Sequence, residues 1–92
     1  MIQGFKDKKT RDLNEGKHVK AFHGFRKQAE KRLRILDAAK TLEDLKGLSS
    51  NRLKALTGDR KAPYSIRINE QWRICFEWKH DGPHNVEITD YH

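Results

Sequence analysis

At 92 residues the chain is long enough for one domain, residues 1–92, and too short for a second. Its 20 Lys and Arg outnumber 13 Asp and Glu, so the net charge is +7 and the isoelectric point is near 9.8. One cysteine, Cys75, excludes an intrachain disulfide, and no apolar run is long enough for a signal-peptide core or a membrane span. We therefore expect a cytoplasmic protein whose partner is a polyanion, nucleic acid rather than membrane.

The positive charge is concentrated before residue 61. Residues 1–60 hold sixteen basic and eight acidic side chains, whereas residues 61–92 hold four and five. The first 60 residues should therefore supply the basic surface, and its contacts with phosphates would confer affinity without sequence choice. The side chains that we expect to make these contacts are Lys8, Lys9, Lys27, Lys31 and Arg34.

The N-terminal part is predicted to hold a short strand and a short helix. Ile2–Phe5 is apolar enough for a strand that joins the sheet formed further along the chain, at its edge or its centre. Residues 6–20 are polar, and Leu13 is the only large apolar residue before Val19, so any helix here is short. Gly16 is expected to end it.

A longer helix is predicted from residue 21. Its apolar side chains are spaced three, four, four and three residues apart, which is the period of one helix face. They are Phe22, Phe25, Ala29, Leu33 and Leu36. A second, shorter helical turn should follow, capped by Thr41 and Asp44 and ended by Gly47.

The last third of the chain alternates apolar and polar residues with the period of two that marks half-buried strands. The predicted strands cover residues 64–68, 72–78 and 86–88, and polar turns at 69–71 and 80–83 separate them. The expected fold is α+β, with a small antiparallel β-sheet of three to four strands packed on one main helix and a minor helix.

The polar face of this sheet is the natural place for a ligand. Arg67, Arg73 and Cys75 lie on the side away from the apolar residues, and counting along the third strand puts Tyr91 on the same side. A tyrosine and two arginines could thus be displayed together on an uncovered face. The simpler alternative is that these positions are solvated and have no function.

Four stretches of the chain resemble the HigB-type toxins of the RelE/ParE superfamily, namely residues 52–60, 64–76, 86–88 and 90–92. The resemblance extends over most of the chain and is most specific in the second and fourth stretches. It implies a sheet curved around helices, cleavage of messenger RNA in the decoding site of the ribosome, and inhibition by a helix-turn-helix antitoxin of the HigA type. We also expect a toxin that is monomeric alone and oligomeric only with its antitoxin, that needs no cofactor, and that holds ribosomal RNA through its basic surface.

Metal-free RNA cleavage uses the 2′-hydroxyl of the substrate as nucleophile, and it needs a base, an acid and a cation at the phosphate. His92 suits the proton transfer, with Asp90 to orient it, because imidazole titrates near neutral pH. Arg73 suits the phosphate, and Arg67 is a further RNA-binding cation on the same face. Tyr91 could stack on a base, bind a phosphate oxygen or move a proton.

Two positions depart from the family pattern. Several members have His where this chain has Lys54, and many have Lys in place of Thr57. Lysine is a poor general base at its usual pKa of about 10.4. We therefore expect His92 and Tyr91 to share the proton transfers and Lys54 to stabilise charge.

Two other classes of function remain open. A ParE-like poison of DNA gyrase would share the fold and need no acid or base, and a basic nucleic-acid-binding module would need no catalytic residue. The Asp-Tyr-His sequence at residues 90–92 favours the ribonuclease. No metal site is expected, because the remaining histidines have no carboxylate or cysteine at metal-ligand spacing. These histidines are His18, His23, His80 and His84.

Overall fold

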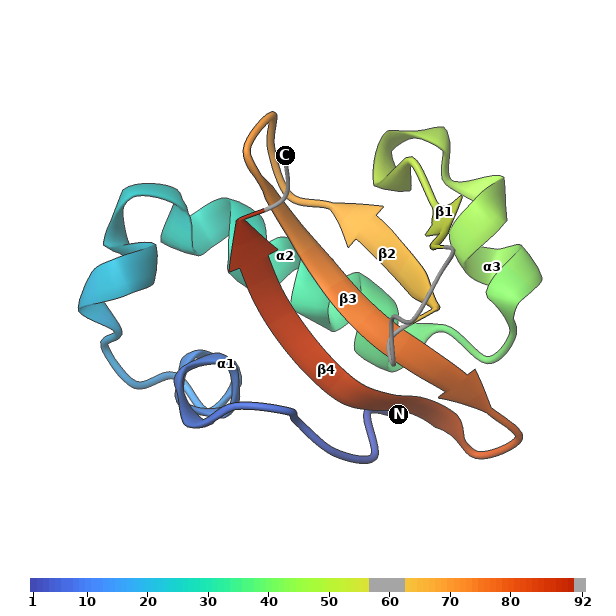
Figure 1. Ribbon diagram of the computed structural model, residues 1–92, viewed down its shortest axis with the longest axis horizontal. Coiled ribbons are helices and arrows are strands. Elements are labelled where there is room, and N and C mark those ends of the chain that lie inside the picture. Colours follow the sequence, from blue (N-terminus) through green and yellow to red (C-terminus); the bar gives the residue numbers. More distant parts are fainter. Residues whose placement is uncertain (57–62, 91–92) are drawn as a thin grey trace.

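The described part of the chain forms a four-stranded antiparallel sheet with helices packed against it (Figure 1). The computed structural model describes residues 1–56 and 63–90, so Thr57, Tyr91 and His92 lie outside the described residues. The strands lie in the order of the sequence, as β1 (Lys54–Ala55), β2 (Tyr64–Arg67), β3 (Trp72–Lys79) and β4 (Gly82–Asp90). The predicted α+β fold is confirmed.

The helices of the described residues are α1 (Lys8–Asn14), α2 (Arg26–Ala38), α3 (Leu42–Gly47) and two 3-10 helices, η1 (Lys20–Phe25) and η2 (Ser49–Asn51). In Figure 1, α2 lies across one face of the sheet, α1 lies beside β4, and α3 lies on the side of β1. Within residues 1–56 and 63–90, no helix has the length and apolar character required to span a membrane.

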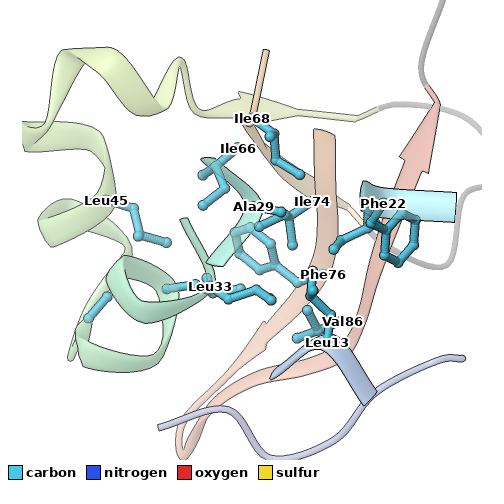
Figure 2. Packing of buried hydrophobic residues seen from close by; sticks show 13 residues of the cluster. Leu13, Phe22, Ala29, Leu33, Leu45, Ile66, Ile68, Ile74, Phe76 and Val86 are labelled. Carbon is cyan, nitrogen blue, oxygen red and sulfur yellow. The ribbon is translucent and has the colours of Figure 1, made fainter. Parts of the chain in front are cut away.

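The core lies between α2 and the apolar face of the sheet. The side chains that α2 buries are those predicted from the spacing, Ala29, Leu33 and Leu36. They pack with Leu13, Phe22, Leu45, Ile66, Ile74, Phe76 and Val86 (Figure 2). Burial of each large apolar side chain contributes about 1.5–3 kcal/mol, which is more than a surface ion pair on α2 can supply. Packing against the sheet therefore holds this helix in place.

The apolar stripe predicted as one helix is divided between two elements. Phe22 and Phe25 lie in η1, and α2 begins only at Arg26. Gly24 lies between the two phenylalanines, and glycine in a helix interior is unfavourable by about 1 kcal/mol relative to alanine. Phe25 still reaches the core, because its ring stacks on Trp72 with the centroids 4.8 Å apart.

The fourth strand is not the segment that the sequence indicated. Ile2–Phe5 contributes an isolated parallel bridge, Phe5 to Val86, at the outer edge of β4. There the main-chain N–H of Val86 donates to the carbonyl oxygen of Gly4 over 3.0 Å. The fourth strand is instead β1, which pairs with the beginning of β2. A strand of two residues is too short to show any periodicity, which explains why the pattern did not indicate it.

The predicted cap at the beginning of α3 is confirmed. The N–H of Asp44 donates to Thr41 Oγ1 over 3.2 Å, and Asp44 Oδ2 accepts from the N–H groups of Lys40 (2.9 Å) and Thr41 (3.1 Å). These backbone bonds, that from Lys40 first, lower the pKa of the Asp44 carboxyl group. The ionised carboxylate is therefore favoured in the folded state.

Replacing Asp44 with Asn is expected to destabilise the chain at neutral pH and to have little effect in acid. A lowered folded-state pKa gives stability that is present above the unfolded pKa and is lost as the pH falls through the folded pKa. Thermal melts followed by circular dichroism from neutral pH down to acid would measure this. Glu43→Gln is the matched control, because it removes a carboxylate from the same turn without removing the cap. A constant difference in melting temperature between parent and Asp44→Asn at every pH would contradict the prediction.

Candidate functional site

The polar face of the sheet carries predicted site residues, and it is less open than expected. The strand register pairs Ser65 with Cys75 and Arg67 with Arg73, so these four side chains share the face away from the core. Arg67 is half-buried, Ser65 and Cys75 are buried, and Arg73 is only 6% exposed. The predicted side of the sheet is correct, but the expectation that Arg73 lies on an uncovered face is wrong. The turn after α3 contributes to this burial, because the carbonyl oxygen of Arg52 accepts a hydrogen bond from Arg73 Nη2.

Arg73 is held in one orientation by acceptors within the protein. Its Nε donates to Ser65 Oγ over 2.7 Å, and its Nη2 donates to the carbonyl oxygens of Arg52 (2.6 Å) and Ser65 (3.2 Å). A buried cation needs such acceptors, because it has given up its hydration. These bonds fix the plane of the guanidinium group and occupy the edge formed by Nε and Nη2.

The turn that follows α3 provides the carbonyl oxygen of Arg52, one of the two carbonyl acceptors of Arg73. Asn51 is fully buried; it donates from Nδ2 to Leu45 O over 3.0 Å and accepts from Arg32 Nη1 over 2.9 Å, which ties the turn to α3 and α2. The next residue, Arg52, has φ 44° and ψ 54°, which is the left-handed region. That conformation costs an L-residue about 1–2 kcal/mol, so the surrounding contacts must maintain it.

Beside Arg73 the surface forms two hollows that share a wall. The first, of about 280 Å³, is lined by Arg52, Lys54, Arg67, Asn69, Glu70 and Arg73. The second, of about 390 Å³, is lined by Gln28, Arg32, Ser50, Arg52, Arg67, Ile68, Asn69 and Glu70. Four cationic side chains and one carboxylate line the first hollow, so its charge favours a phosphate group.

The first hollow brings together three residues that the sequence singled out, Lys54, Arg67 and Arg73. It also adds Arg52, which sequence reasoning missed, and the second hollow adds Arg32. Neither arginine could be found from a periodic pattern, because one lies in an irregular turn and the other is one of several cations on α2. Their position next to Arg73 depends on how α3 and the following turn pack against the sheet.

A family model described as "RelE-like toxin of type II toxin-antitoxin system HigB" matches residues 3–92 of the chain. The chain belongs to the HigB-like toxin family. A curated relative, Toxin HigB-1 of Vibrio cholerae serotype O1, is 44% identical over 48 residues, which are 52% of this chain. They are 50% of the relative, so the chain spans about half the length of the protein that it matches. The resemblance predicted from the sequence is confirmed.

In this HigB-like chain the end of β4 pairs with the part of β3 that contains Arg73. Thr89 pairs with Arg73 across the two strands, and Asp90 follows it. Asp90 is exposed, and its Oδ2 accepts a hydrogen bond from Gln71 Nε2 over 2.9 Å. Residues 91–92 are outside the described part, so the roles assigned to this tripeptide stay predictions.

The other basic residues predicted to contact nucleic acid do not line either hollow. Those exposed on α2 are Lys27, Lys31 and Arg34, and those exposed on α1 are Lys8 and Lys9. The main-chain N–H of Ile88 in β4 donates to Thr10 Oγ1 in α1 over 3.0 Å. α1 therefore lies at the edge of the sheet opposite β1, and the lysines of α1 belong to a cationic region separate from the hollows (Figure 1).

The side chains that commonly bind metal ions are scattered in the described part of this HigB-like chain. Among residues 1–56 and 63–90, no group of three His, Cys, Asp or Glu side chains is suited to a metal ion. His84 in β4 has its Nε2 2.6 Å from Oδ1 of Asp81, which lies in the turn between β3 and β4, and this hydrogen bond lowers the pKa of Asp81. Cleavage of RNA without a metal ion therefore stays a prediction.

Proposed function

We propose that this chain is the toxin of a type II toxin–antitoxin pair, and that it cuts messenger RNA on the ribosome while the message is translated. The observation that carries the proposal is the cationic hollow beside Arg73, in a chain whose residues 3–92 match the HigB-like family. The hollow has the charge that binds a phosphodiester, and the family supplies the expectation that RNA is the substrate. The toxin would act in the cytoplasm, where translation takes place.

The proposed reaction uses the 2′-hydroxyl of the RNA as nucleophile. It attacks the adjacent phosphorus, the bond from phosphorus to the 5′-oxygen breaks, and a 2′,3′-cyclic phosphate remains. Arg73, Arg67 and Lys54 would stabilise the negative charge that builds up on the phosphate. His92 and Tyr91 would take the proton from the 2′-hydroxyl and give one to the leaving oxygen. No metal ion or cofactor is needed in this scheme.

Arg73 would contribute mainly by the fixed position of its charge. Its Nε and Nη2 already donate to Ser65 and Arg52. The edge of the guanidinium group that would bind two phosphate oxygens side-on therefore already makes hydrogen bonds within the protein. A cation that is held before the substrate arrives requires no reorganisation during the reaction. Asp90 would orient the proton-transferring residues that follow it.

The proposed partners are the ribosome with its messenger RNA and a helix-turn-helix antitoxin of the HigA type. The cations of α2 and α1 would hold ribosomal RNA outside the hollows through phosphate contacts, which weaken steeply as the salt concentration rises. We propose that the toxin alone is monomeric and that it has no membrane partner.

Induction of the chain in bacterial cells without an antitoxin is expected to stop growth and to produce transcripts cut inside codons. Primer extension on a reporter transcript, with and without a start codon, would map the cuts and show whether they need translation. Lys79→Gln is the control variant, because it removes an exposed cation at the far end of β3 and should remain toxic.

The same experiment separates the alternatives. Undiminished cleavage of naked RNA would contradict the dependence on ribosomes. Broken DNA in the presence of gyrase, with intact transcripts, would identify a gyrase poison instead. Growth inhibition or RNA binding without any cut in RNA or DNA would leave a basic binding module.

A further inference from the structure

Arg52 combines an unfavourable backbone conformation with a place in both hollows. Its φ of 44° lies in the region that glycine adopts freely and that other L-residues adopt at a cost. Its exposed side chain lines the first hollow and the second, on the wall that they share. A residue kept in such a conformation suggests that its side chain, and not only its backbone, has a use.

The backbone of Arg52 is fixed on both sides. Its N–H donates to Ser49 O over 3.1 Å, and its carbonyl oxygen accepts from Arg73 Nη2 over 2.6 Å. The preceding residue, Asn51, is fully buried and is bonded to Leu45 and Arg32. The turn therefore determines where the Arg52 side chain begins, and that point lies between the two hollows.

The charge around the second hollow is also positive. Arg32, Arg52 and Arg67 line it together with a single carboxylate, that of Glu70. Because Arg52 and Arg67 line both hollows, the cationic surface is continuous from Arg73 to the side of α2. A single strand of RNA carries one negative charge for every nucleotide, so it matches a continuous cationic surface better than an isolated cation does.

We propose that the two hollows hold neighbouring phosphates of one RNA strand, and that the Arg52 side chain binds the strand where it passes from one hollow to the other. The second hollow is then the binding site for a nucleotide that flanks the cleaved bond. This inference rests on the proposed function, since it takes RNA as the substrate. Arg52 has two separate tasks, because its carbonyl oxygen positions Arg73 while its side chain binds the strand.

Arg52→Gly separates these two tasks. Glycine keeps the carbonyl oxygen and adopts the left-handed conformation freely, whereas the cation is lost. Relief of the backbone strain and the greater freedom of glycine in the unfolded chain act in opposite directions, so the melting temperature should stay close to that of the parent. Arg52→Lys keeps the charge and the strain. Lys79→Gln is the control for the loss of one cation elsewhere.

The test measures the rate of reporter-transcript cleavage as the concentration of programmed ribosomes is varied, together with thermal melts of each purified variant. Arg52→Gly is expected to lose about tenfold or more at low ribosome concentration, as for one charge-assisted contact. Arg52→Lys should recover most of this loss, and Lys79→Gln should match the parent. The logarithm of the binding constant for a short single-stranded RNA falls linearly with the logarithm of the salt concentration. In Arg52→Gly this slope should be shallower than in the parent by about 0.7.

Each outcome decides between the proposals. A parent that cuts no transcript refutes the proposed function. A parent that cuts, with Arg52→Gly equally active, overturns only the role of the Arg52 side chain. Should Arg52→Gly melt well below the parent, Arg52→Asn repeats the comparison, because asparagine also tolerates the left-handed region. If both variants lose activity only in proportion to their stability, the residue is structural and the inference is wrong.

Discussion

Arg73→Lys is expected to lower transcript cleavage by about 10²–10³-fold, the usual effect of removing a preorganised group that stabilises transition-state charge. It should also lower the melting temperature. Lysine keeps the positive charge, but its ammonium group cannot reproduce the planar arrangement that reaches Ser65 Oγ, Ser65 O and Arg52 O at once. Each hydrogen bond to a charged group contributes about 1.5–3 kcal/mol, so a buried ammonium with fewer acceptors is costly.

Two further variants separate the catalytic role of Arg73 from its structural role. Ser65→Ala removes the hydroxyl acceptor of Arg73 Nε and leaves the guanidinium group in the protein. Arg67→Lys changes the cation that pairs with Arg73 on the neighbouring strand, and Arg67 is less buried than Arg73. Cleavage rates on ribosomes and thermal melts would be measured for all three variants. If the rate follows the melting temperature throughout the set, Arg73 only supports the fold. A fully active and fully stable Arg73→Lys would remove it from the proposed site altogether.

Tyr91→Ala and deletion of His92 are each expected to relieve toxicity, with a loss of about 10²–10⁴-fold in cleavage if these residues transfer protons. Changes at the last residues of a chain usually cost little stability, so we expect melting temperatures close to that of the parent. Tyr91→Phe separates the ring from the hydroxyl group, since retained activity would indicate stacking. Growth assays, primer extension and circular dichroism would measure these effects.

Asp90→Asn is the milder member of this series. Asparagine can still accept the hydrogen bond from Gln71, so the end of β4 should be preserved while the negative charge is lost. A modest reduction in cleavage is expected if Asp90 orients its neighbours. If every inactive variant of residues 90–92 melts well below the parent, the tripeptide supports the fold and the catalytic assignment fails. A fully toxic deletion of His92 would move the proton donor to Lys54 or Tyr91.

The parts of the fold that could be predicted are those whose side chains repeat a pattern of burial. The spacing of Ala29, Leu33 and Leu36 on α2 and the alternation along β2, β3 and β4 each follow from one face packing on the core. The cap of α3 was predictable because Thr41 and Asp44 act within a few residues of each other. Local chemistry of this kind is visible in the sequence.

The surroundings of Arg73 could not be predicted in the same way. Alternation along a strand gives the side of the sheet on which a residue lies, but not what packs over that side. Arg73 is buried, and a turn 21 residues earlier places the carbonyl oxygen of Arg52 within hydrogen-bonding distance of it. The sequence does not indicate the left-handed conformation of Arg52, because glycine or asparagine usually occupies such a position. The count of charges also did not reveal that Lys8 and Lys9 lie at the opposite sheet edge from β1.

The contact between α1 and β4 has a consequence for the order in which the chain folds as it is made. The hydrogen bond from Ile88 to Thr10 joins residues 78 positions apart. Synthesis at about 5–20 residues per second leaves an interval of about 4–16 s before the partner of Thr10 exists. A helix of seven residues is not stable alone during that time. We therefore expect α1, which is synthesised well before β4, to be among the last of the described elements to become ordered.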